Sequence, residues 1–91
     1  MWQPLELPGG DLIATGLDDL RQGRETPASL LVSIGAPRLR RLGYDVPPGP
    51  GDPEHRLYGL LAQDGGAAAH SRYNGLIRRL VSFERAAECA R

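Results

Sequence analysis

The segment AAAHSRYNGLIRRLVSFERAAECAR, residues 67–91, decides the fold, because its apolar residues recur at three- and four-residue steps. This spacing places them on one face of a helix and predicts a single long amphipathic helix. Polar residues, several of them arginines, follow the same steps on another face. The apolar face comprises Tyr73, Leu76, Ile77, Leu80, Phe83 and Ala87, and the polar face Ser71, Asn74, Arg78, Ser82, Arg85 and Cys89.

The dipeptide Asn74-Gly75 is the weakest point of this predicted helix. Glycine inside a helix costs about 1 kcal/mol relative to alanine, and Asn-Gly is a common turn dipeptide. The apolar residues stay in phase on both sides of the dipeptide, which favours a continuous helix. Gly75 would then allow another helix to approach closely.

Three shorter helices are predicted upstream, over residues 11–23, 26–35 and 37–43. Each begins at a residue suited to an N-cap or first turn and ends at a glycine suited to a left-handed stop. The residues that carry these boundaries are Asp11, Gly23, Thr26, Pro27, Gly35, Pro37 and Gly43.

The Pro/Gly-rich run at 47–51 predicts a loop, because it suits neither a helix nor a central strand. Asp52-Pro53 then begins a further helix, which buries Leu57, Leu60 and Leu61 and ends near residues 64–66. So short a turn predicts that this helix and the last one are antiparallel. Residues 1–10 are expected to be extended, with Trp2, Leu5 and Leu7 against the bundle.

Composition supports one all-α domain over residues 1–91. Fourteen leucines stand against three isoleucines and three valines, a balance that favours helices over strands. We therefore expect a bundle of four to five helices, with the long C-terminal helix as its spine. The loop at 47–51 would separate an N-terminal helical half from a C-terminal hairpin.

The charge balance argues against a general nucleic-acid-binding domain, which usually carries a positive excess. Eleven acidic residues match eleven basic ones, and every basic residue is arginine. Arginine makes bidentate contacts that lysine does not, although codon bias in a GC-rich bacterial genome explains the same usage. The single cysteine, the missing signal-peptide pattern and the lack of a long apolar run indicate a cytoplasmic protein without a membrane span.

The leading functional interpretation is a non-catalytic protein–protein interaction module that acts through its C-terminal helix. Self-association into a homodimer and binding of another protein both fit this interpretation. The residues predicted to bind the partner are Arg72, Asn74, Arg78, Arg79, Ser82 and Arg85. The alternative for these arginines is structural, since acids such as Asp18, Asp19, Glu25 and Glu54 could pair with them across the bundle.

A second interpretation, from another class, is a small DNA-binding regulator. Residues 30–43 resemble a helix-turn-helix in outline, with Gly35 at the turn and three arginines in the short helix that follows. That helix would present Arg38, Arg40 and Arg41 to DNA. Gly43 ends it after about two turns, however, which is short for insertion into a groove.

Catalytic and metal sites find little support in the sequence. His70 with Arg72, Tyr73 and Asn74 offers a general base and a phosphate-binding arginine, as a ribonuclease would need, but no second catalytic element is visible. His55 and His70 lack the paired spacing of a zinc site. We therefore expect no enzyme activity, no metal and no cofactor.

Overall fold

Four helices make up the structure, a computed structural model that describes residues 6–63 and 66–90. They are α1 (Gly10–Arg21), α2 (Pro27–Arg41), α3 (Pro53–Gln63) and α4 (Gly66–Cys89). No strand occurs in these described ranges, so the predicted all-α class is confirmed. The number of helices is the lower of the two expected.

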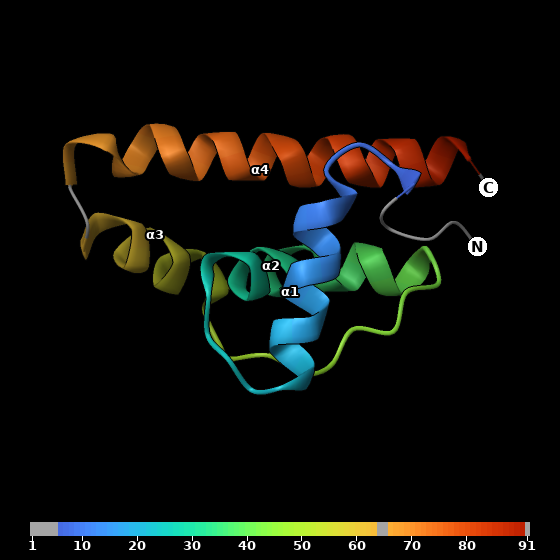
Figure 1. Ribbon diagram of the computed structural model, residues 1–91, viewed down its shortest axis with the longest axis horizontal. Helices are drawn as coiled ribbons and strands as arrows, with labels where there is room; N and C mark the ends of the chain where they lie inside the picture. The colour runs from blue at the N-terminus through green and yellow to red at the C-terminus, as the bar shows by residue number, and fades with distance from the viewer. Residues whose placement is uncertain (1–5, 64–65, 91) are drawn as a thin grey trace.

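The long axis of the molecule follows α4 (Figure 1). A helix of 24 residues is about 36 Å long, close to the 38 Å length of the molecule. α3 and α4 run antiparallel along one another, as predicted, and α1 crosses both α2 and the line of α4 steeply (Figure 1).

The centre of the fold is α2, which contacts α1, α3 and α4. Its Leu30, Leu31, Val32 and Leu39 have no exposed surface, and each such side chain contributes about 2 kcal/mol through burial. By contrast, α4 is the longest helix and keeps one side exposed. The expectation that α4 is the spine is therefore right about its length and wrong about its position.

The predicted helix boundary at Gly35 and Pro37 is wrong, because α2 continues through both residues. Gly35 serves helix packing instead: a Cβ atom there would lie 2.8 Å from Leu80 Cδ1 of α4. Pro37 is exposed. Val32 before it and Leu39 after it are fully buried, and their packing in the core holds both halves of α2 in one helix. The short basic helix predicted at 37–43 is thus the last part of α2.

The other predicted helix ends are mostly confirmed. Gly23 and Gly43 take positive φ angles of 75° and 101° just after α1 and α2, where glycine carries no steric penalty. Thr26 caps α2: its Oγ1 accepts from the backbone N–H of Ser29 at 3.1 Å. Asp11 is not the N-cap of α1, because Gly9 holds that position and Asp11 lies in the first turn.

The connection from α1 to α2 is held by Asp19, which is 7% exposed. One carboxylate oxygen accepts from Arg24 Nη2 at 2.8 Å and Nε at 3.0 Å. The other accepts from the hydroxyl of Thr26 at 2.6 Å. Together these hydrogen bonds hold the pKa of Asp19 below its usual value, with Thr26 the larger cause.

The segment between α2 and α3 is a loop, as predicted, but it contributes to the core. Tyr44 and Val46 are buried, and the centroid of the Tyr44 ring lies 5.6 Å from the centroid of the Phe83 ring on α4. The N-terminal half and the C-terminal hairpin therefore share one core. Residues 1–10 were expected to be extended, but residues 7–9 form a bend and a turn. Leu7 packs on the core, and Trp2 and Leu5 lie outside the described residues.

α4 is continuous through Asn74-Gly75, as predicted. α3 begins at Pro53 and buries Leu57 and Leu61, while Leu60 is partly buried. Residues 64 and 65 of the predicted turn lie outside the described ranges.

Within those ranges, none of the four helices combines the length and apolar character needed to span a bilayer.

We expect Gly16→Ala to destabilise the protein and Gly59→Ala to stabilise it. Both glycines lie inside helices, so alanine gains about 1 kcal/mol of helix propensity at each. At Gly16 the added Cβ would overlap the Ala28 carbonyl oxygen of α2, whereas at Gly59 it meets nothing within 4 Å. Overpacking costs about 1–3 kcal/mol. Urea unfolding of both variants checks the expectation, and equal stabilisation by both would contradict the α1–α2 contact.

We expect Asp19 to stabilise the fold at neutral pH and to lose that effect in acid. Because its pKa is lowered on folding, its contribution is complete above the unfolded pKa and is lost as pH falls through the folded one. Asp19→Asn should therefore be less stable than the wild type at about pH 7, with the difference narrowing towards about pH 3. The exposed neighbour Asp18→Asn is the control, and a pH-independent difference for Asp19→Asn would contradict this assignment.

Candidate protein-binding surface on α4

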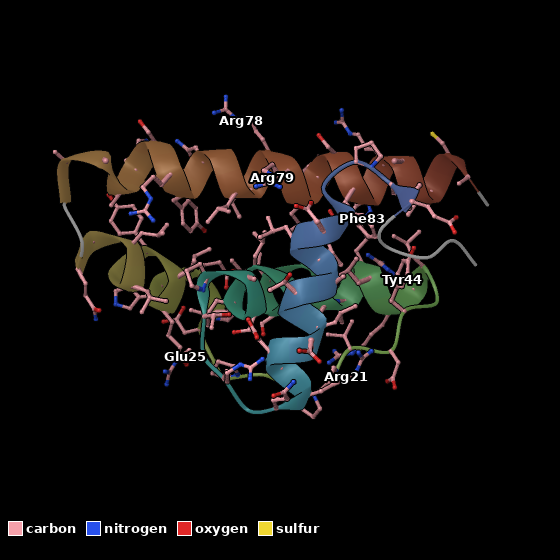
Figure 2. The ribbon with its side chains drawn as sticks, in the orientation of Figure 1. Arg21, Glu25, Tyr44, Arg78, Arg79 and Phe83 are labelled. Atoms are coloured by element: carbon pink, nitrogen blue, oxygen red, sulfur yellow. The ribbon has the colours of Figure 1, made fainter. Side chains whose placement is uncertain are left out.

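The polar face predicted for α4 is the side of the helix that faces away from the bundle. All six of its residues, Ser71, Asn74, Arg78, Ser82, Arg85 and Cys89, are exposed. Figure 2 shows Arg78 pointing away from the other helices. We call this set the outer face of α4.

The arginines of the outer face have no partner within the described part of the chain. No ion pair or hydrogen bond to a described residue is made by Arg78 or Arg85 of this face, or by Arg72 on the neighbouring row. Among the other described arginines, only Arg21 also lacks such a contact. The remaining described arginines are held by carboxylates or backbone carbonyls, or have another contact. Unpaired positive charge is therefore concentrated on α4.

The two acidic residues of α4 face the other way, towards α2. Glu84 is 6% exposed, and its Oε1 lies 3.9 Å from Arg38 Nη1. Glu88 accepts a hydrogen bond from the same guanidinium. Both carboxylates of α4 thus pair with Arg38 of α2, Glu84 buried and Glu88 exposed, whereas Arg78 and Arg85 lie on the outer face. The outer face has no carboxylate of its own and is positive in a chain of zero net charge.

Glu84 is the buried charged residue that sequence reasoning missed. Periodicity places it on the apolar face of α4, four residues after Leu80 and seven after Ile77, but a charged residue there gave no signal that its carboxylate would be buried. In the structure it lies against Gly35, whose missing side chain leaves room for the carboxylate. Burial raises the pKa of Glu84, and the charge of Arg38 partly opposes the rise.

A second row of α4 arginines, Arg72 and Arg79, lies beside a shallow groove rather than on the outer face. The groove is also lined by Pro27 of α2, Leu61 of α3, and Gly75 and Leu76 of α4. Arg79 Nη2 lies 3.4 Å from Asp11 Oδ1, and both side chains are more than half exposed. Such a pair contributes little to stability.

The predicted pairing of α4 arginines with acids elsewhere in the bundle is largely wrong. Asp18 and Asp19 pair with Arg24 of the same connection, and Glu25 pairs with Arg56 of α3. Within the part of the chain that the structure describes, Arg79 is the only arginine of α4 that pairs with an acid outside α4, and that acid is Asp11. The arginines of the outer face therefore do not fix the geometry of the bundle.

The three arginines of the DNA-binding interpretation belong to the last turn of one continuous helix, not to a separate recognition helix. Arg38 is held by Glu84 and Glu88, and Arg40 donates to the carbonyl oxygens of Val46 and Pro47 at 3.0–3.4 Å. Arg41 also has a partner. The helix-turn-helix outline seen in the sequence is not present in residues 27–43.

The residues considered for a ribonuclease do not converge. His70 and Asn74 lie one turn apart on the exposed side of α4, and the distance from His70 Nε2 to Asn74 Nδ2 is 3.2 Å. Tyr73 turns towards α3, where its ring lies 5.7 Å from that of Tyr58. Among the described residues, no group of three or more His, Cys, Asp or Glu side chains could hold a metal ion.

Comparison with known proteins adds no assignment: no family model, curated protein or solved structure matches this chain.

We expect Glu84→Gln to remove a pH dependence of stability. Because folding raises the pKa of Glu84, its contribution is complete below the ordinary value of 4.5 and is lost as pH rises through the folded value. The variant stays neutral, so its stability relative to the wild type should increase from about pH 4 to about pH 7. Denaturant unfolding at both pH values measures this, with the exposed Glu88→Gln as control. Parallel pH profiles for wild type and Glu84→Gln would contradict it.

Proposed function

We propose that this protein is a non-catalytic interaction module that binds an acidic protein partner through the outer face of α4. The observation that carries the proposal is the one-sided charge of α4. Arg78 and Arg85 lie two turns apart on an exposed face and make no ion pair with the described residues. The carboxylates of the same helix point to Arg38.

A rigid row of arginines suits recognition of carboxylates. Each guanidinium has a planar set of donors that matches a carboxylate in a bidentate geometry. Because α4 is a continuous helix packed on α2 and α3, the positions of its arginines are set before the partner arrives. Preorganised charge raises the association rate and selects for partners of opposite charge.

Self-association through the same helix is the other form of this proposal, and charge makes it the less favourable one. A two-fold contact places the same patch of both copies together. The outer face carries arginines and no carboxylate, so its pairing with itself would bring two positive surfaces into contact. A partner that supplies carboxylates avoids this repulsion.

We expect Arg78→Glu/Arg85→Glu to abolish binding of an acidic probe while the helix content is retained. The probe is a fluorescein-labelled helical peptide of glutamate and alanine, and anisotropy at about 50 mM and 200 mM salt reports its affinity. Wild-type binding should weaken with salt, because exposed charges are screened. Circular dichroism checks the fold of the variant.

The single variants Arg78→Glu and Arg21→Glu are the matched pair, since both change one exposed arginine that has no described partner and alter the net charge equally. We expect about a ten-fold loss of affinity for the first and little change for the second. Equal losses would mean that only net charge matters and would contradict a defined face. Tighter binding of duplex DNA or RNA than of the peptide would assign the face to nucleic acid. A dimer in light scattering that the double variant dissociates would assign it to a second copy.

A further inference from the structure

The groove beside Arg72 and Arg79 has an apolar floor and an open top. Pro27, Leu61 and Leu76 form the floor at the place where the N-terminal half of α4 passes over α3 and the start of α2. Its volume is about 350 Å³, the lower end of the range for ligand sites. Leu76 is only partly buried by its own chain.

Gly75 lies in this groove and has no packing role within the described chain. A Cβ added at Gly16 or Gly35 would meet a neighbouring helix, whereas one added at Gly75 would meet nothing within 4 Å. Glycine there costs about 1 kcal/mol of helix stability relative to alanine. Its effect is to keep the floor of the groove low and to leave room for an atom group from outside.

Arg72 and Arg79 stand at the two ends of the groove. They are seven residues apart, which is about 10.5 Å along the helix. Arg72 makes no ion pair among the described residues, and the contact of Arg79 with Asp11 is long and exposed. Both guanidiniums are therefore available to carboxylates that enter with the occupant of the groove.

We propose that the groove receives one large apolar side chain from an amphipathic helix of the acidic partner. Acidic residues one turn before and one turn after this apolar anchor pair with Arg72 and Arg79. An i−3 and i+4 arrangement on a helix spans seven residues, the same spacing as the two arginines, and places acids and anchor on one face. The inference rests on the proposed function and names the chemistry of the segment that is bound.

Two labelled helical peptides test the inference. Both carry glutamates three residues before and four residues after a central position, which is Leu in one peptide and Ala in the other. Burial of the leucine side chain in the groove should give the Leu peptide about ten-fold higher affinity. In Arg72→Ala/Arg79→Ala, both peptides should bind more weakly and with less dependence on salt.

The matched pair of protein variants is Gly75→Leu and Gly59→Leu. Both sites are helix glycines with open space around them, so both variants should unfold at or above the wild-type temperature. Gly75→Leu fills the groove and should remove the preference for the Leu peptide, whereas Gly59→Leu should retain it. In nuclear magnetic resonance spectra, the Leu peptide should shift the amide signals of residues 72–79 in the wild type.

Failure of the groove and failure of the proposed function give different results. Equal affinity for the two peptides, unchanged by Gly75→Leu, would overturn the groove inference. If Arg78→Glu/Arg85→Glu still abolished that binding, the proposed function would stand. Absence of binding by both peptides to the wild type would overturn both.

Discussion

Burial of α2 is the constraint on which the rest of the structure depends. Four of its side chains have no exposed surface, and every other helix reaches the core by packing on α2. A domain of this size buries a small share of its surface and has little surplus stability. Each helix must therefore pack closely on α2 to bury enough apolar surface. Gly16 of α1 permits close contact between α1 and α2, and Gly35 of α2 permits close contact between α2 and α4. α2 and α4 lie so close there that the Glu84 carboxylate fits between them only because Gly35 has no side chain.

The parts of the fold that sequence predicts are those governed by local chemistry. Thr26-Pro27, Gly23 and Gly43 mark helix ends because cap hydrogen bonds and positive φ angles are properties of a few neighbouring residues. The phase of Tyr73, Leu76 and Leu80 likewise reported one continuous α4. Gly35 misled the sequence reading because a glycine for a helix stop and a glycine for a helix contact look the same until the partner helix is known.

The candidate surface was predicted in part for the same reason. Helical periodicity placed Arg78 and Arg85 on an exposed face, since that depends on α4 alone. Their lack of acidic partners depends on where Asp18, Asp19 and Glu25 lie, and the structure commits those acids to Arg24 and Arg56. The inward position of Glu84 follows from the periodicity of α4, whereas the room and the opposite charge for its carboxylate come from Gly35 and Arg38 of α2.

Charge and packing together separate the two sides of α4. Desolvation of Glu84 carries a cost, and exposure of the carboxylate on the outer face would avoid it. The buried position, with Arg38 nearby, instead leaves the outer face without negative charge. Gly75 follows the same logic, because alanine would give a more stable helix and a shallower groove. Both residues lower the stability of the isolated chain, and both preserve features that a partner with acidic and apolar groups would use.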